Sequence, residues 1–305
     1  MSPLKRIGAH ASIAGGIDRA VERGAAAGCD VLQIFTKNSN QWRARPLGAG
    51  EIARFRELQS KTGIAPVIAH DSYLINLASP DPTLHARSCQ AFGEELDRCE
   101  ALGIPALVAH PGAHMGAGEE AALARIAASL DALLAARPGH AVRVLLETTA
   151  GQGSCVGHRF EHLGSIMDRM VHGRRVGVCL DTCHVFAAGC DLRSEKGYHR
   201  TMAELDRAVG LGRVEAFHLN DSKKGLGSRV DRHEHIGQGA LGVEAFRWLM
   251  NDPRFDGVPM VLETPKGSDG AEDRRNLGVL RDLIAQRRPR TSARAASSGA
   301  GARAR

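Results

Sequence analysis

The sequence predicts a single (β/α)8 barrel of the TIM type, and three observations support this fold class. Eight short apolar segments alternate with longer helical segments from near the N-terminus to about residue 286. This alternation predicts a parallel sheet with crossover helices, and eight such units match a closed barrel. Polar side chains suited to ligand binding follow most of the apolar segments, whereas an open doubly wound sheet binds its ligands at one switch point.

The clearest strand is the segment 176–181, within RVGVCLDTCH. Its apolar residues indicate a strand buried on both faces of the sheet. The apolar run ends at Asp181 and His184 follows closely, so this strand delivers polar side chains to its carboxyl end. By the same criterion, the eight expected strands span 4–10, 30–36, 65–70, 104–110, 142–147, 176–181, 214–220 and 258–263.

Helices are expected between these strands, separated from them by glycine-containing turns and polar loops. The segment 84–102 is the longest and is amphipathic. The expected helices span 16–27, 51–62, 84–102, 119–136, 160–170, 201–209, 242–250 and 273–286.

Composition indicates a cytoplasmic protein with reduced thiols. No apolar run reaches the roughly 18 residues that would predict a membrane span, and the first ten residues lack the apolar region of a signal peptide. The 7 cysteines include no C-x-x-C pair, so we expect small core thiols rather than disulfides. Aromatic residues make up only 4% of the chain, which argues against an interface built from aromatic platforms.

The formal net charge of +6 resides in the C-terminal segment 287–305, which holds six Arg and no acidic residue. Without it, the 40 basic residues fall to 34, equal to the 34 acidic ones. We expect residues 1–286 to form the barrel domain and 287–305 to be a disordered Arg-rich tail. Affinity of the barrel for nucleic acid must therefore arise from local charge.

Histidine and acidic residues recur at the ends of successive strands. In a barrel the carboxyl ends of all strands ring one mouth, where the active sites of this fold lie. Asp231 and His233 are separated by one residue, so in an extended segment both project to the same side. The strand-end residues are His10, His70, His110, Glu147, Asp181, His218 and Glu263, with His184 following the sixth strand.

Taken together, these residues indicate a metal centre, although a single strand-end histidine is usually a packing residue. Carboxylates crowded in one hollow would raise one another's pKa unless cations neutralised them. Imidazole with carboxylate suits zinc or a similar transition metal better than magnesium or calcium. The ligands are too many for one tetrahedral ion, and they suffice for two or three ions if carboxylates bridge.

Clustered divalent cations are suited to the hydrolysis of phosphate esters, which implies a phosphate-containing substrate. The loops offer basic side chains for backbone phosphates, although each of them taken singly is more often a solvated loop residue. These side chains are Lys37, Lys223, Lys224, Arg229 and Arg232.

Long motifs covering the barrel resemble the endonuclease IV family, the zinc-dependent apurinic/apyrimidinic endonucleases of base-excision repair. They run in order from about residue 4 to about residue 283, and the C-terminal tail has no counterpart in the family pattern. The motifs are GAHASIAGG, FTKNSNQW, HDSYLINLASP, VAHPGAH, LLETTAGQG, GVCLDTCHVFAAGCD, HLNDSK, DRHEHIGQG and LETPK.

The resemblance implies a centre of three zinc ions per chain, with manganese an alternative at one of them. Glu147 would bridge ions, and Glu147 and Glu263 would be the catalytic carboxylates. The implied reaction uses zinc-bound hydroxide to hydrolyse the phosphodiester 5′ to an abasic site, leaving a 3′-hydroxyl and a 5′-deoxyribose phosphate. The implied ligands are His70, His110, Glu147, Asp181, His184, His218, Asp231, His233 and Glu263.

The resemblance also implies that the protein is a monomer acting on double-stranded DNA that contains abasic sites or blocked 3′ ends, which it would trim. Tyr73 and Leu74 match the residues that the family inserts into DNA at the lesion. Asn40 departs from the family pattern because it stands where the family has an inserting arginine. The expected DNA contacts are Tyr73, Leu74, Asn40, Lys37, Lys223 and Arg232.

Two other classes of protein compete with this interpretation. A sugar isomerase or epimerase would place one or two metals at the same mouth, but the D-x-H pair and the third set of ligands argue against it. A non-catalytic DNA-damage binding protein would be favoured by the loss of ligands, and none is lost. Cleavage of DNA that contains one abasic analogue separates the three classes.

Overall fold

The computed structural model describes residues 5–267 and 269–284, and within them eight parallel strands form a closed barrel. Each strand pairs with its spatial neighbours, and β12 pairs with β1 to close the ring. The predicted TIM barrel is therefore confirmed. In spatial order the strands are β1 (Arg6–His10), β12 (Pro259–Leu262), β9 (Val214–His218), β8 (Val176–Asp181), β6 (Arg143–Glu147), β4 (Ala106–Ala109), β3 (Val67–His70) and β2 (Val31–Phe35).

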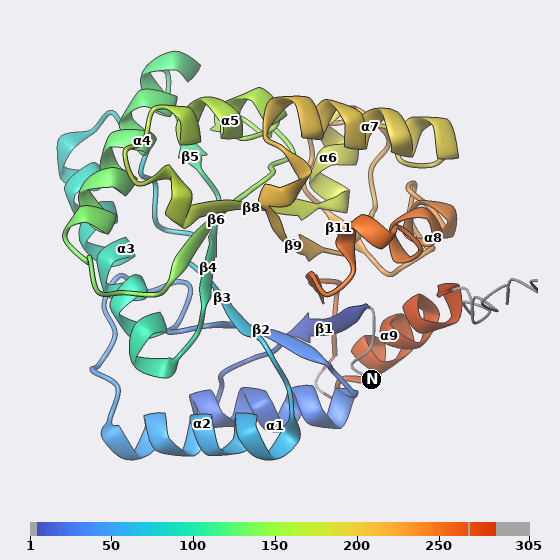
Figure 1. The fold of residues 1–305 in the computed structure, drawn as a ribbon, viewed down its shortest axis with the longest axis horizontal. Coiled ribbons are helices and arrows are strands. Elements are labelled where there is room, and N and C mark those ends of the chain that lie inside the picture. The colour runs from blue at the N-terminus through green and yellow to red at the C-terminus, as the bar shows by residue number, and fades with distance from the viewer. Residues whose placement is uncertain (1–4, 268, 285–305) are drawn as a thin grey trace, which may run out of the picture.

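Helices surround the ring of strands, as the view in Figure 1 shows. The longest, α3, illustrates how the chain sets their ends: the Asp81 carboxylate accepts the Leu84 N–H at its start, and Gly103 ends it in the left-handed conformation. The helices are α1 (Ile17–Ala27), α2 (Ala49–Thr62), α3 (Pro82–Leu102), α4 (Glu119–Ala135), α5 (Phe160–Asp168), α6 (Thr182–Ala188), α7 (Glu195–Ala208), α8 (Val243–Met250) and α9 (Ala271–Leu283), with short 3-10 turns at Gly173–Arg175, Leu211–Arg213 and Pro253–Phe255.

Apolar side chains fill both faces of the strands, so the barrel has an inner and an outer core. Because successive strand residues point to opposite faces, Leu32 and Ile34 of β2 pack toward the helices, whereas Val31 joins the inner core. The inner core consists of Val31, Ile68, Ala106, Val108, Leu145, Cys179, Ala216 and Val261. This inner core fills the interior of the barrel, whereas polar side chains lie at the carboxyl ends of the strands.

Several short elements were not predicted from the sequence. Helix α6 begins directly after β8, because Asp181 ends the strand and also caps the helix by accepting the His184 N–H at 2.8 Å. Helix α7 begins at Glu195, six residues before the predicted start at 201. Two antiparallel pairs of two-residue strands lie in the loops: β5 (Gly112–Ala113) with β7 (Cys155–Val156), and β10 (Asp221–Ser222) with β11 (His233–Glu234).

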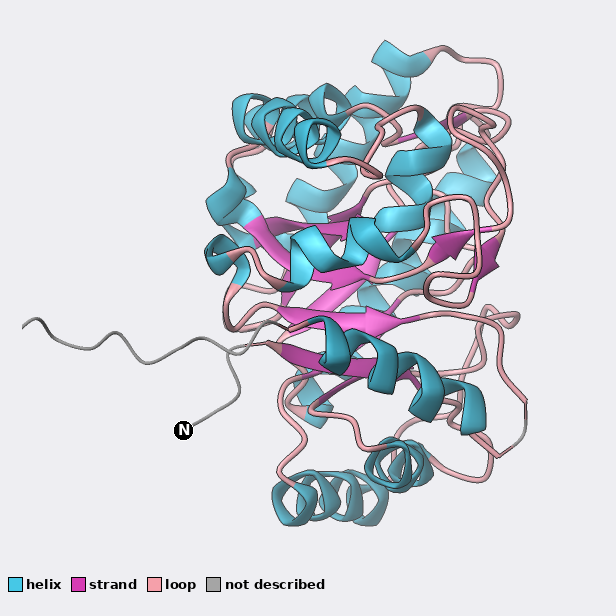
Figure 2. Cartoon of the chain, turned by 90° about the vertical axis from the view of Figure 1, so that its right-hand side faces the viewer, coloured by secondary structure: helices cyan, strands magenta, loops and turns pink. Residues whose placement is uncertain are grey.

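Long loops gather at the end of the barrel toward which the strands run, as Figure 2 shows from the side. This end is the mouth at which the predicted ligands should meet. Within the described ranges, no helix is long and apolar enough to cross a membrane. The predicted Arg-rich tail, 287–305, lies outside the described residues.

Candidate metal centre

All nine predicted ligands converge at the mouth of the barrel. Six strands supply them at or just after their carboxyl ends, and α6, β11 and the loop just before β11 supply the rest. Their side chains form three groups in which one potential ligand atom of each residue lies within 4.8 Å of the others. The groups are His70–His110–Glu147, His184–Asp231–His233 and Glu147–Asp181–His218–Glu263.

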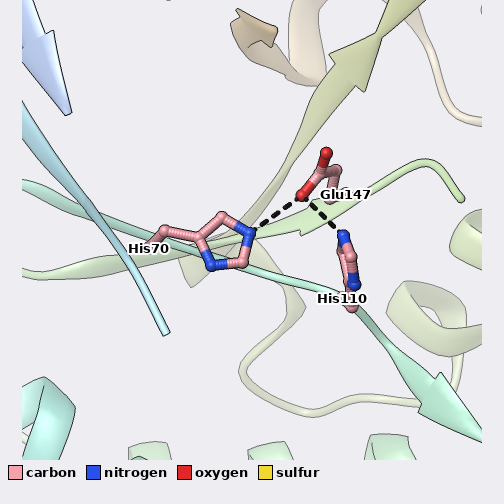
Figure 3. Close-up of side chains that lie close together, drawn as sticks. All are labelled: His70, His110 and Glu147. Carbon is pink, nitrogen blue, oxygen red and sulfur yellow. Dashed lines mark hydrogen bonds and ion pairs between the residues drawn. The ribbon is translucent and has the colours of Figure 1, made fainter. Parts of the chain in front are cut away.

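The first group is centred on one oxygen of Glu147. Its Oε2 lies 3.1 Å from His70 Nε2 and 3.2 Å from His110 Nε2. Figure 3 shows the carboxylate between the two imidazoles, each on a different strand end. Glu147 and His70 are buried, whereas the His110 side chain is 37% exposed, so this group opens toward the mouth.

The second group joins a helix to a loop. His184, in the first turn of α6, points its Nε2 at Asp231 Oδ2 at 3.1 Å, and His233 Nε2 lies 3.2 Å from the other oxygen. Pairing of β10 with β11 places Ser222 opposite His233 and keeps this segment extended. The predicted same-side projection of Asp231 and His233 therefore agrees with their position.

The third group shares Glu147 with the first. Its Oε1 lies 2.9 Å from His218 Nδ1, and that nitrogen lies 3.2 Å from Glu263 Oε2. Asp181 Oδ2 lies 3.9 Å from the same nitrogen and 3.7 Å from His233 Nε2. Glu147 thus connects the first group to the third, and Asp181 lies between the third and the second.

Hydrogen bonds from Nδ1 of three of the imidazoles to backbone carbonyls turn the other nitrogen of each of these rings toward the centre. Where Nδ1 donates to a backbone carbonyl, the proton is on Nδ1 and the lone pair is on Nε2. Within the described chain, Nε2 of His184 and of His233 are buried without a hydrogen bond of acceptable geometry. The Nδ1 donations run from His70 to Asp71 at 2.8 Å, from His184 to Thr148 at 2.8 Å and from His233 to Glu263 at 3.2 Å.

The electrostatics of the centre are those of buried carboxylates stabilised by positive charge. Burial alone would raise the pKa of Glu147, but the charges of His218 and His110 hold that pKa well below its usual value. Burial opposes a charged His233, yet Asp181 and Asp231 raise its pKa to about 9. Divalent ions would replace the imidazole protons as the source of this positive charge.

The donor set fits transition-metal ions. Five imidazoles and four carboxylates, with free nitrogens turned inward, match the ligands that zinc prefers. A carboxylate whose two oxygens face different groups, as in Glu147, can bridge ions. The nine residues could therefore hold more than one ion, although the identity and number of the ions stay predictions.

The predicted DNA contacts divide into exposed and buried side chains. Tyr73 is 62% exposed, and its ring lies 5.8 Å from that of the predicted ligand His70. Leu74 is partly exposed, whereas Asn40, Lys223 and Arg232 are exposed on the loops of the mouth.

Lys37 requires a correction to its expected environment. Its side chain is only 2% exposed, its Nζ donates to the Gln41 carbonyl at 2.9 Å, and it pairs with Glu95 at 3.4 Å. In this structure the amine is therefore held inward rather than offered to solvent, and the DNA contact of Lys37 stays a prediction. Lys37 instead holds the base of the loop that carries Asn40.

Two buried amides next to the ligands were not singled out from the sequence. Asn220 donates to Asp181 Oδ2 at 2.6 Å and accepts the Glu263 backbone N–H at 2.8 Å. Gln33 contacts His218 and Glu263. The available signal was a polar residue inside an otherwise apolar strand, in DVLQIFT, or directly after one, in HLNDSK.

A further cluster, of Glu119, His158 and His162, lies outside the nine predicted ligands and does not fit a cation. N–H donors face both ring nitrogens of His162, the Gly157 N–H at 3.1 Å from Nδ1 and the Arg159 Nε–H at Nε2, so neither nitrogen is free for an ion. The Arg159 guanidinium lies 2.9 Å from that Nε2 and 2.9 Å from Glu119, which places a positive charge where an ion would bind.

Comparison with known proteins agrees with this fold. A family model described as "Xylose isomerase-like TIM barrel" matches residues 21–283. A protein of Chloroflexus aurantiacus named "Probable endonuclease 4" is 57% identical over 281 residues, which cover 92% of this chain and 99% of that protein. A protein of the same name from Geobacter sulfurreducens is 54% identical over 281 residues, which cover 92% of this chain and 95% of that protein.

Solved structures also match over most of the chain. The crystal structure of endonuclease IV from Thermus thermophilus matches with a TM-score of 0.81 and 38% identity, covering 92% of this chain and 98% of that one. A D-psicose 3-epimerase from Clostridium cellulolyticum matches with a TM-score of 0.67 and 14% identity, over 92% of this chain and 99% of that one, which shows a shared fold alone.

These matches and the barrel define the class of the protein as a xylose isomerase-like TIM barrel. Within that class, the identity to the curated relatives extends over nearly their whole length. The chain belongs to the endonuclease IV family of DNA-repair endonucleases, so the predicted resemblance is confirmed.

Proposed function

We propose that this protein hydrolyses the DNA phosphodiester on the 5′ side of abasic sites, leaving a 3′-hydroxyl and a 5′-deoxyribose phosphate, and that it also trims blocked 3′ ends. The observation that carries the proposal is the set of nine ligand side chains in three groups, with Glu147 common to two of them. No protein nucleophile is needed for such a reaction. We further propose that the protein acts as a monomer in the cytoplasm.

Three zinc ions, with manganese an alternative at one position, would supply Lewis acidity and an activated water at the mouth. The chain's own part is to hold the ions close together. Glu147 and Glu263 are the carboxylates on which the reaction most depends, because both are placed in the third group and Glu147 also reaches the first. His70, His110, Asp181, His184, His218, Asp231 and His233 complete the ligands.

Recognition of the lesion is assigned to loops around the centre. Turning an abasic nucleotide out of the helix costs less than turning out an intact one, because it has no base to unstack or unpair. Apolar and aromatic side chains can then fill the gap and hold the duplex bent. We assign this role to Tyr73 and Leu74, and we assign phosphate contacts to Lys223 and Arg232. Asn40 is shorter than arginine and uncharged, so the loop that carries it would fill less of the gap.

Incubation with a duplex that carries a single abasic analogue tests the proposal directly. The expected result is one cut on the 5′ side of the analogue, with a product whose 3′ end a polymerase can extend. A duplex with a 3′-blocked nick tests end trimming in the same experiment. Binding without cleavage would support a damage-binding protein instead, and inertness toward DNA together with epimerisation of a ketose would support a sugar epimerase.

A further inference from the structure

Gln33 is a polar residue at the centre of an otherwise apolar strand. Its neighbours Leu32 and Ile34 pack outward against the helices, so strand alternation turns Gln33 into the barrel. It is fully buried, and β2 pairs it with His10 of β1 on one side and Ile68 of β3 on the other. Strands β1 and β2 supply none of the nine predicted ligands, and Gln33 reaches across the barrel from this side.

The two ends of the Gln33 amide contact two different predicted ligands. Its Oε1 lies 2.8 Å from His218 Nε2, and its Nε2 donates to Glu263 Oε1 at 2.6 Å. The amide nitrogen also lies 3.0 Å from His10 Nδ1. The opposite amide orientation would place the carbonyl oxygen against the Glu263 carboxylate, so the neighbours determine which end is which.

This orientation determines the protonation of His218. The Gln33 carbonyl can only accept, so the His218 Nε2 must carry a proton and donate it. The lone pair of the neutral ring is then on Nδ1, the atom that faces Glu147 at 2.9 Å and Glu263 at 3.2 Å. For three other imidazoles of the centre a backbone carbonyl performs this function, whereas His218 depends on a side chain that can be replaced.

We propose that Gln33 is a positioning residue that holds His218 and Glu263 together in the orientation needed to bind one ion. The inference rests on the proposed function, because it assumes that these two residues are metal ligands. A hydrogen-bond chain runs from the Glu263 carboxylate through the amide to the His218 ring. This hydrogen-bond chain fixes Oε1 of Glu263 and Nε2 of His218. The other carboxylate oxygen of Glu263 and Nδ1 of His218 then face the same point. Loss of such an outer partner typically lowers metal affinity by about 10- to 100-fold.

The test replaces Gln33 by methionine, which keeps the length of the side chain and removes both hydrogen bonds. Gln90→Met is the matched control, because Gln90 is exposed on α3 and, among the described residues, its amide donates to Glu94 alone. Purified zinc-loaded proteins are mixed with a chromogenic chelator, and the number of ions and their release rates are recorded. Gln33→Met should release one ion about tenfold or more faster than wild type and keep the others. Gln90→Met should match wild type.

The same samples separate positioning from a structural role. Under single-turnover conditions, Gln33→Met should lower the maximal cleavage rate of abasic duplex and leave the affinity for that duplex unchanged. Cobalt substitution should show an altered d–d absorption band for one ion. Equal release of every ion by wild type and Gln33→Met overturns the inference while leaving the proposed function intact. Faster release of all ions together, with a lower melting temperature, also overturns it. A wild-type protein that holds no transition metal would overturn the proposed function itself.

Gln33→Glu keeps the proposal falsifiable if the methionine variant does not fold. The carboxylate still accepts from His218 but cannot donate to Glu263, and it adds repulsion against that residue. We again expect one ion to be bound more weakly and the others to be unaffected. Wild-type release rates in Gln33→Glu would show that the donation to Glu263 does not position it, which contradicts the proposal.

Discussion

At the scale of single residues, Glu263 and Glu147 are the positions of the centre that we expect to tolerate substitution least. Both are carboxylates at strand ends, and each faces the free nitrogen of His218. A charged carboxylate can be buried here only because positive charge surrounds it. Their role therefore depends on charge as well as on shape.

Substitution Glu263→Gln tests this role, because it keeps the shape of the side chain and removes the charge. We expect the cleavage rate to fall by several orders of magnitude while abasic duplex still binds. Single-turnover cleavage and a binding titration measure the two effects separately. A rate within about tenfold of wild type, a change of only ~1.4 kcal/mol in the barrier, would contradict the assignment.

Tyr73 is the second residue whose substitution is informative. It is 62% exposed although it is aromatic, and its ring packs edge-on against Phe35 at 5.4 Å. We expect Tyr73→Ala to weaken binding to abasic duplex far more than binding to undamaged duplex, with the metal content unchanged. Val171→Ala is the control, because Val171 is 86% exposed and follows α5 rather than a strand end. Equal losses for both duplexes, or loss of metal, would indicate that Tyr73 is structural.

At the scale of elements, the β10–β11 pair determines where Asp231 and His233 lie. Asp221 of β10 is buried, and its carboxylate accepts the backbone N–H groups of Ser222 and Leu241 at 2.7 and 2.9 Å. These bonds fold the long loop back on itself and keep the D-x-H segment extended. The ligands of the second group therefore depend on a loop rather than on the barrel strands alone.

Gly239→Ala tests this dependence. A Cβ at Gly239 would lie 2.4 Å from Asp221 Oδ1 and from the Ser222 carbonyl oxygen, so β10 and the segment that carries Gly239 must shift apart. We expect faster release of the ion held by the second group, measured by chelator competition. Gly225→Ala, in the same loop, has no atom within 4 Å of the added methyl group and should behave as wild type. Identical release from the two variants would show that the β10–β11 pair does not support the centre.

The elements also show what sequence patterns can and cannot predict. The strand 176–181 was predicted with its observed bounds, because an apolar run that ends in Asp181 identifies both the strand and its carboxyl end. The helix α6 was missed because Asp181 belongs to both elements and no turn separates them. The nine predicted ligands followed from strand ends and from the resemblance. The role of Gln33 was not predicted, because its partners are distant in sequence and only the closed barrel brings them together.

At the scale of the whole molecule, the barrel concentrates four carboxylates and five imidazoles at one mouth. Such a cluster is stable only if protons or cations balance its charge. Ions that bind the folded chain and not the unfolded one also stabilise the fold. The metal centre is therefore expected to contribute to stability as well as to activity.

Metal removal tests this expectation. Elemental analysis of the purified protein should find between two and three transition-metal ions per chain, mostly zinc. Prolonged chelation should abolish cleavage and lower the melting temperature, and added zinc should restore both. Fewer than one tightly held ion per chain would contradict the multinuclear assignment, whatever the activity.

The pairing of β12 with β1 joins the last strand of the barrel to the first. During synthesis on the ribosome, the ligands of the first group are all present once Glu147 has emerged, and those of the second group once His233 has emerged. The third group waits for Glu263, just beyond β12, and for the return of that strand to the N-terminal one. A product truncated before β12 thus lacks one predicted ligand and the closing strand together, so a complete set of predicted ligands requires the chain at least as far as Glu263.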